Sequence, residues 1–293
     1  MASGYAPHVV ESSGQRFRRR LSQPFIYLVA LIVVGTMVAP VLYVMIGGFR
    51  STKQINADPA GWPDPWLFDN YIGVLTSGRF WGQAWHSTLA AVGTTAGVVI
   101  LGVMAAFIIA RYEFRGRSAM YSLFTAGLLF PLTIAILPLS IMLRSLGLFG
   151  NVLGLIVPQV AFALPITVII LVPFLRAVPG ELEDAASIDG ASKLGFFWRI
   201  LLPLSGPGLV TVGVLAFVGS WNAYLLPLFV LSAGGAHVNE YTLPLGVAQF
   251  SSQYSSDTAA ILAFTSLAMI PALAFFLAMQ NRIVSGLQGA VKG

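Results

Sequence analysis

Four of the eleven acidic residues of this sequence cluster in one polar stretch, residues 181–190, which begins just after Pro179. Proline followed by acids is typical of a helix start, because carboxylates offset the positive end of the helix dipole. Gly190 supplies the backbone freedom that ends a helix, and Ser192 can cap a second helix, which we expect to stop at Pro203. The stretch therefore predicts a helix, a tight turn and a second helix.

Two kinds of partner could bind this helical pair, a membrane surface or another protein. Amphipathic helices can lie on a membrane, but acids in the first turn would be repelled by an anionic leaflet. Ala185 and Ala186 are small enough to let another backbone approach closely, and a turn at Gly190 forms an exposed tip. These features favour protein docking.

The sequence shows no pattern for catalysis or metal binding. A phosphate-binding P-loop needs Gly-Lys followed by Ser or Thr, yet Lys53, Lys193 and Lys292 follow Thr, Ser and Val. The histidines are scattered without metal or triad spacing, and the chain has no cysteine. We therefore expect a protein that is not an enzyme and binds no cofactor or metal. The alternative from another class is an integral membrane enzyme, which would need a catalytic cluster at the interface.

The composition predicts membrane spans, because 57% of the 293 residues are hydrophobic and only 9% are charged. These spans would position the acidic stretch. A spanning helix needs roughly 20 apolar residues. Six stretches of about that length lack Asp, Glu, Lys and Arg: 24–46, 88–110, 119–142, 152–175, 209–231 and 259–279. We predict an all-α polytopic membrane protein with six transmembrane helices. Its parts are an N-terminal segment 1–23, a transmembrane domain 24–279 containing a patterned loop at about 176–207, and a tail 280–293.

Basic residues near the span ends indicate the orientation. Most of them lie on the side of the patterned loop, so we expect this loop and both termini in the cytoplasm, at a bacterial or archaeal plasma (inner) membrane. The net charge of +5 could suggest nucleic acid, but anionic headgroups explain basic residues at membrane borders. We therefore expect membrane lipid as a partner and no nucleic acid.

Neutral polar and aromatic residues inside a span are candidates for a solute pathway. The fifth predicted span holds Ser220, Trp221, Asn222 and Tyr224, whose hydroxyl, amide and ring groups suit sugar hydroxyls and sugar faces. No ionisable Asp, Glu, Lys or Arg lies inside a span, which disfavours a proton relay or a strongly charged solute. The alternative is that Asn222 joins neighbouring helices and Trp221 packs between them.

The acidic stretch resembles the EAA loop of ABC-importer permeases. The matching positions are Asp184, Ala185, Ala186, Gly190, Ile200 and Pro203, with Asp189 resembling the carbohydrate branch. The family normally has Glu where this chain has Asp184, which shortens the reach of the acid by one methylene. Glu183 is the neighbouring acid that could substitute. Segments 110–116, 221–222 and 280–293 also resemble the maltose-type second permease subunit, so the resemblance covers nearly the whole chain.

This resemblance implies an ABC type I importer permease fold and a multi-subunit assembly. It implies a second permease subunit of a different chain, two ATPase subunits that carry ATP and Mg, and an external solute-binding protein. The EAA-loop residues would contact an ATPase subunit, and the tail residues Gln280, Arg282 and Gly286 would reach the ATPase dimer. The expected function is import of a mono- or oligosaccharide. Two alternatives stay open: another small polar solute such as glycerol phosphate or a polyamine, and a structural subunit that does not transport.

Overall fold

The computed structural model describes the backbone of residues 13–253 and 257–291, and the side chains of residues 23–251, 253 and 257–280. Within these ranges every regular element is helical, as the sequence predicts. The longer helices are α1 (Ser13–Gly47), α4 (Gly78–Arg111), α5 (Arg117–Gly127), α6 (Leu132–Ser145), α7 (Leu153–Ala177), α8 (Glu181–Ile188), α11 (Gly206–Trp221), α13 (Leu243–Gln253) and α14 (Thr258–Val291). The short elements are α2 (Thr52–Ala57), α3 (Asp69–Thr76), α9 (Lys193–Phe196), η1 (Phe197–Leu201), α10 (Leu202–Leu204), α12 (Leu225–Pro227), η2 (Leu228–Ser232) and η3 (Val238–Glu240).

Four of the six predicted spans are single helices that are long and apolar enough to cross a membrane. They are Gln23–Gly47, Gly78–Arg111, Leu153–Ala177 and Thr258–Gln280. Two further spans arise only if each of two bent helix pairs counts as one, which gives up to six in the described residues. The all-α polytopic prediction is therefore confirmed, and two predicted spans are corrected in shape.

The third predicted span, 119–142, is broken rather than continuous. Helix α5 ends at Gly127, α6 begins at Leu132, and the two axes differ by 100°. Pro131 explains the break, because a proline ring clashes with the carbonyl four residues earlier, here that of Gly127, and has no N–H to donate.

The fifth predicted span, 209–231, is broken in the same way. Helix α11 ends at Trp221, and residues 222–224 are not helical before α12 begins. In a continuous helix the ring of Pro227 would clash with the carbonyl of Ala223, four residues earlier, which disfavours helical structure at this point. Instead, α11 pairs with the preceding helical segment, Lys193–Leu204, across a bend of 76°.

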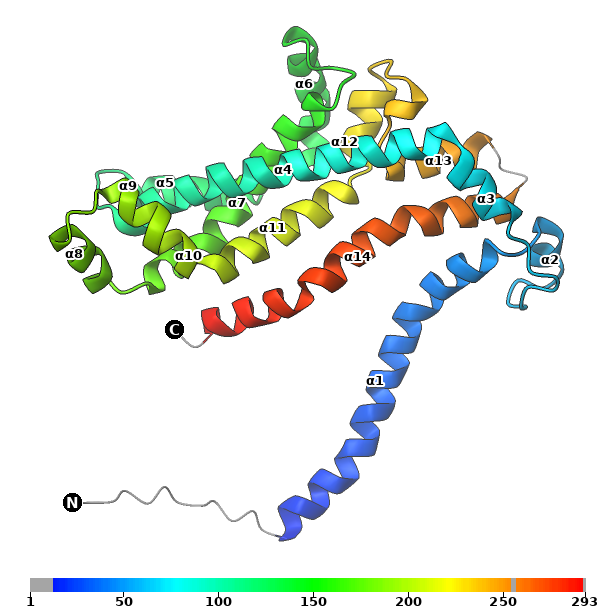
Figure 1. Ribbon diagram of the computed structural model, residues 1–293, viewed down its shortest axis with the longest axis horizontal. Helices are drawn as coiled ribbons and strands as arrows, with labels where there is room; N and C mark the ends of the chain where they lie inside the picture. The colour runs from blue at the N-terminus through cyan, green and yellow to red at the C-terminus, as the bar shows by residue number, and fades with distance from the viewer. Residues whose placement is uncertain (1–12, 254–256, 292–293) are drawn as a thin grey trace.

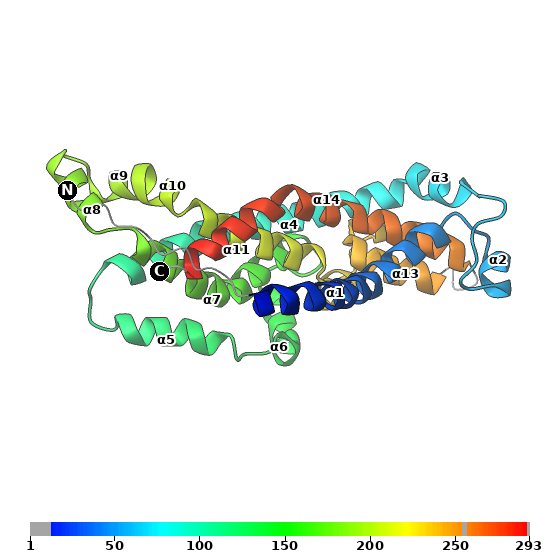
Figure 2. The ribbon, with the colours of Figure 1, turned by 90° about the horizontal axis from the view of Figure 1, so that it is seen from below.

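The body of the molecule is a bundle in which α4 packs against α7 and α11, and α11 packs against α14. Figures 1 and 2 show these helices running lengthwise, with α8 to α10 at one end and α2 and α3 at the other. Helix α1 leaves the α2 end and diverges from the bundle (Figure 1). The patterned loop therefore caps one end of the helices that form the core.

Small residues on α4 bring it close to α7. A Cβ atom at Gly93 would lie 2.6 Å from Ile156 Cδ1, and one at Gly97 would lie 2.7 Å from Val160 Cγ2. Both distances are shorter than real Cβ contacts, so a larger residue at either position would have to displace the facing side chain of α7. Close packing through small residues is typical of membrane helices, where backbones approach without a hydrophobic driving force.

Hydrogen bonds hold the opposite end of the bundle together. Arg50 is buried and donates from Nη2 to the carbonyls of Gln54 and Asp58, at 2.7 and 2.5 Å. The Tyr71 hydroxyl donates to the Met45 carbonyl at 2.6 Å. Burial raises the pKa of Tyr71 above its usual value, so the phenol keeps the proton that this bond needs.

Candidate functional site

The acidic stretch folds as a helix, a turn and a second helix, which confirms that prediction. Helix α8 carries three acids in its first turn and ends at Ile188. Gly190 follows two residues later, and its φ of +80° lies in the left-handed region that favours glycine. The Ala191 N–H donates back to the Ala186 carbonyl at 2.8 Å. Ser192 then caps α9, because its Oγ accepts from the Gly195 N–H at 3.1 Å.

Pro203 does not stop the second helix, contrary to the prediction. The helix widens into the π-helical turn η1, residues Phe197–Leu201, and Pro203 lies inside the following α10. A wider turn lets the chain pass a proline, whose ring would otherwise clash with the carbonyl of Arg199. The direction changes only at Ser205, directly before α11.

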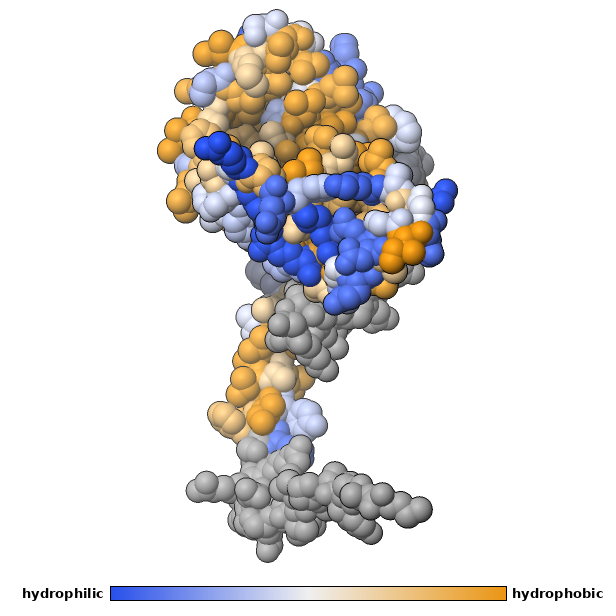
Figure 3. Space-filling view, turned by 90° about the vertical axis from the view of Figure 1, so that its left-hand side faces the viewer, coloured by the Kyte–Doolittle hydropathy of each residue, from blue (hydrophilic) through white to orange (hydrophobic). Residues whose placement is uncertain are grey.

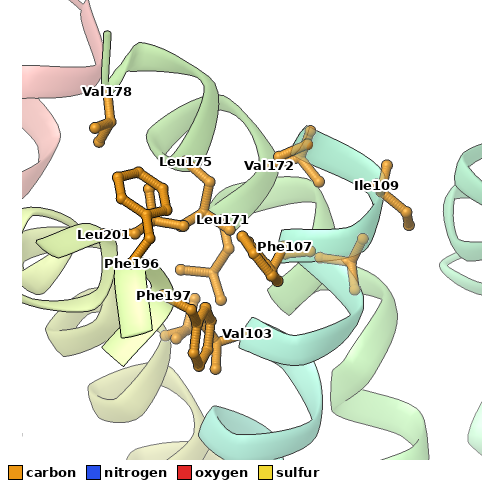
Figure 4. Close-up of a cluster of buried hydrophobic side chains, with 14 of the residues drawn as sticks. Val103, Phe107, Ile109, Leu171, Val172, Leu175, Val178, Phe196, Phe197 and Leu201 are labelled. Carbon is orange, nitrogen blue, oxygen red and sulfur yellow. The ribbon is translucent and has the colours of Figure 1, made fainter. Parts of the chain in front are cut away.

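One face of this loop is embedded in a hydrophobic core. Ala186 of α8 is buried there with Phe196, Phe197 and Leu201, against the ends of α4 and α7. Figure 4 shows the two phenylalanines between those helix ends, and the rings of Phe197 and Phe107 lie 4.7 Å apart between centroids. Ile200 packs at the edge of the cluster. The loop is therefore a packed extension of α4 and α7.

Arg111, the last residue of α4, joins the loop to the bundle by polar contacts. Its side chain is only 9% exposed, and Nη1 lies 4.0 Å from Glu183 Oε2. Nη2 donates to the Val178 carbonyl at 2.7 Å, and the guanidinium lies 5.9 Å from the centre of the Phe196 ring. The Arg111 guanidinium thus contacts Val178, which precedes α8, and Glu183 within α8. It also lies near Phe196 of α9.

The two neighbouring acids of α8 have different surroundings. Glu183 points inwards to Arg111, with a side chain 27% exposed. Asp184 is exposed, as are Ala185, Asp189 and Gly190, and Asp184 has no ion pair with any described residue. Glu183 is therefore engaged within the chain, and the acid open to another molecule is Asp184.

Large hydrophobic side chains are exposed around this polar tip. Ile188 at the end of α8 is 87% exposed, and Leu182, Leu194 and Trp198 are also exposed. Viewed from this end, hydrophilic residues form a band across the near side of a mostly hydrophobic molecule (Figure 3). A surface that mixes exposed acids, alanines and large apolar groups suits a protein partner.

The predicted solute-pathway residues lie at the break after α11, between two cavities of about 410 Å³ each. Ser220 lines the first cavity and Asn222 the second, while Tyr224 lines both. Trp221 is mostly buried and its indole N–H donates to the Ala268 carbonyl of α14 at 3.3 Å. Trp221 therefore packs between α11 and α14 and also lines the second cavity, so all four predicted residues border one of the two cavities.

Residues 98–289 match the family described as binding-protein-dependent transport system inner membrane components. This match covers about two thirds of the chain, including the whole acidic loop and every residue that lines the two cavities except Thr94. The chain belongs to that family. As a permease it is a transport protein and not an enzyme, and it is an integral, multi-pass component of an inner membrane.

Curated relatives match the permease over most of its length. It is 35% identical to the diacetylchitobiose uptake system permease protein NgcG of Streptomyces coelicolor, over 93% of this chain and 88% of that protein. It is 37% identical to the trehalose transport system permease protein SugB of Mycobacterium tuberculosis, over 89% of this chain and 95% of that protein.

A solved structure confirms the fold of the permease. A chain of a bacterial ABC transporter involved in the import of the acidic polysaccharide alginate superposes with a TM-score of 0.72 and 20% sequence identity. The alignment covers 93% of this chain and 98% of that one. The ABC importer permease fold expected from the EAA-like loop is therefore correct.

Sequence reasoning missed two contributors to these sites. Arg111 was predicted only as one of the basic residues near the span ends and as part of segment 110–116, although its side chain holds α8. Gln159 lies inside the fourth predicted span and lines the first cavity, where it accepts hydrogen bonds from Thr94 and Ser220. An amide within an apolar stretch was the available signal.

The predicted tail contacts fall mostly outside the described side chains. Gln280 is exposed near the end of the last candidate span. Helix α14 continues from that span into the tail as far as Val291. At Arg282 and Gly286 the structure describes only the backbone, so their predicted contacts with an ATPase stay a prediction.

Proposed function

We propose that this permease imports a sugar, a mono- or oligosaccharide, in an ATP-driven ABC-type importer. The observation that carries the proposal is the construction of α8: one face is packed on α4 and α7, and the other presents Asp184, Ala185 and Gly190 outwards. Relatives that match nearly the whole chain are named for diacetylchitobiose and trehalose uptake, and both solutes are saccharides.

In the proposed mechanism, α8 docks into a groove on an ATPase subunit and moves with it. Asp184 would meet a basic residue of the ATPase, while Ala185 and Gly190 would let the two surfaces approach closely. The motion would pass through Arg111 and the aromatic cluster around Phe197 into α4 and α7. Packed helices then move as rigid bodies and alternate the access of the cavities.

The proposed assembly contains a second permease of a different chain, two ATPase subunits and an external solute-binding protein. ATP and Mg would bind to the ATPase subunits, because this sequence has no P-loop. The α8 end and both termini would face the cytoplasm, and the outer end with α2 and α3 would receive the binding protein. Gln280, Arg282 and Gly286 would reach the ATPase dimer.

The cavities support a neutral solute over a charged one. No Asp, Glu, Lys or Arg side chain is among the residues that line the two cavities beside Tyr224. A polyamine or glycerol phosphate would need opposite charges to offset the loss of its hydration. Hydroxyl, amide and aromatic side chains suit a sugar better.

Uptake by the assembled importer tests the proposal. The permease is purified with its partner subunits and placed in vesicles with ATP inside, and the binding protein is added outside. Uptake of labelled glucose, maltose, trehalose and N,N′-diacetylchitobiose is measured, with vesicles lacking ATP as the control. We expect saturable, ATP-dependent uptake of at least one sugar. Uptake of spermidine or glycerol phosphate alone would contradict the sugar assignment, and uptake of none of these solutes would favour a structural subunit.

A further inference from the structure

We infer that the cavity between α7 and α11 holds a binding subsite for solute hydroxyl groups, and that Gln159 is its main hydrogen-bonding residue. The inference rests on the proposed sugar import and places a solute contact on this chain. The cavity has a volume of about 410 Å³, which lies within the range of ligand pockets, about 300–1,000 Å³.

Three helices contribute one polar group each to this cavity. The Thr94 hydroxyl of α4 donates to Gln159 Oε1 at 2.8 Å, and the Ser220 hydroxyl of α11 donates to the same oxygen at 2.5 Å. Thr94 and Ser220 are both buried. The two hydroxyls use the acceptor end of the amide and fix its orientation on α7.

The donor end of the same amide is left over. Gln159 Nε2 is buried and has no hydrogen-bond partner among the described residues. Exchanging the two ends of the amide would leave Oε1 unpaired instead, because both hydroxyls would then accept from Nε2. Either orientation leaves one buried, unpaired polar atom on Gln159, a residue that lines the cavity, and such an atom costs folding free energy. A solute hydroxyl that enters as the cavity opens would supply the missing partner.

The rest of the cavity wall has the character of a sugar site. The aromatic rings of Phe162 and Tyr224 line it together with aliphatic side chains. Sugars present hydroxyls at their edges and C–H groups on their faces, so an amide beside aromatic rings can contact both kinds of surface. No charged side chain lines this cavity, which fits a neutral ligand.

A matched control comes from the residue next to Thr94. The Thr95 hydroxyl donates to the Ala91 carbonyl of its own helix at 2.7 Å, and Thr95 does not line the cavity. Thr95→Val therefore removes a hydroxyl from the same turn of α4 without touching the Gln159 cluster. Thr94→Val removes one of the two hydroxyls that hold the amide.

The test compares Gln159→Met with Thr95→Val in the assembled importer, using the four labelled sugars named above. We expect Gln159→Met to raise the half-saturating concentration of a transported sugar about three- to tenfold, the factor that one neutral hydrogen bond supplies. Thr95→Val should leave it unchanged. An unchanged value in Gln159→Met, with uptake intact, would overturn the inference alone. Uptake of none of the sugars by the unaltered importer would overturn the proposed function and this inference together.

A second readout separates a solute contact from a packing role. The chain has no cysteine, so Ala223→Cys, in the cavity wall, gives one reactive thiol on this chain. A saturating transported sugar should slow its labelling by a small maleimide several-fold, and Gln159→Met should remove this protection at the same sugar concentration. If Gln159→Met fails to assemble, Thr94→Val replaces it, with an expected two- to threefold rise in half-saturation. If the sugar does not change the rate at which maleimide labels the Ala223→Cys thiol, a solute site in this cavity is contradicted.

Discussion

Arg111→Met tests how the permease holds helix α8. Methionine keeps much of the packing of the arginine stem but has no charge and no donor. The substitution removes the hydrogen bond from Nη2 to the Val178 carbonyl, 2.7 Å long, and the ion pair with Glu183 at 4.0 Å. Both partners lie where the chain passes from α7 into α8, so the effect should concentrate there.

The magnitude follows from the burial of the two contacts. A hydrogen bond from a charged donor contributes about 1.5–3 kcal/mol, and the arginine is only 9% exposed. The ion pair adds less than about 1 kcal/mol, because Glu183 is 27% exposed and solvent screens it. We therefore expect the packed state of the α8 loop to lose about 2–3 kcal/mol relative to its locally open state.

Hydrogen exchange of the assembled importer measures this loss. A change of about 2–3 kcal/mol corresponds to opening that is roughly 30- to 150-fold more frequent. The amides of Asp189 and Ala191 report it, because they donate to carbonyls within the loop at 3.0 and 2.8 Å. Arg115→Met is the matched control, since Arg115 is exposed and has no hydrogen bond or ion pair with a described residue. Unchanged protection in Arg111→Met would show that the hydrophobic cluster alone holds α8, and would refute the reasoning.

Substitutions at three further positions test other parts of the account. Gly190→Val forces a β-branched residue to φ +80°, which costs about 1–3 kcal/mol, and should lower the sugar imported per ATP hydrolysed; normal coupling would contradict a docking role for this turn. Asp184→Lys should reduce the ATPase recovered with the permease, whereas Asp184→Glu should retain it; equal recovery would exclude an ion pair there. Tyr71→Phe removes the bond to the Met45 carbonyl and should lower the melting temperature of the complex by an amount equivalent to about 1 kcal/mol; an unchanged temperature would refute this.

Local signals in the sequence were sufficient to predict α8 and its turn. The acids of the first turn, Gly190 at positive φ and the Ser192 cap act within a few residues. Such capping interactions depend little on the rest of the fold. The four unbroken spans were predictable for a similar reason, because an uncharged apolar run of roughly 20 residues favours a helix that spans the membrane.

The effect of proline inside a span was not predictable in this way. Helix α7 contains three prolines and stays one helix, whereas Pro131 and Pro227 each accompany a break. A proline frees a carbonyl wherever it occurs, and neighbouring packing decides whether the helix can continue. Helix α7 is packed between α4, α5 and α11. This packing cannot be predicted from the residues around each proline.

The polar cluster at Gln159 was not predictable from the sequence, because its members are far apart along the chain. Its hydrogen-bond partners lie 65 and 61 residues away, in Thr94 and Ser220. Ser220 was predicted as a pathway residue on its chemistry alone. Only the packing of α4, α7 and α11 against one another brings the amide and the two hydroxyls together at one cavity.

Co-purification tests the central claim, that this permease acts through an ATPase that docks on α8. The tagged chain is isolated in mild detergent, its partners are identified by mass spectrometry, and ATP hydrolysis by the isolated material is assayed. We predict a stoichiometric second permease and an ATPase subunit, with less ATPase recovered when Asp184→Lys replaces the unaltered chain. Isolation of the chain alone in several detergents, without ATP hydrolysis, would contradict the account and favour a structural subunit.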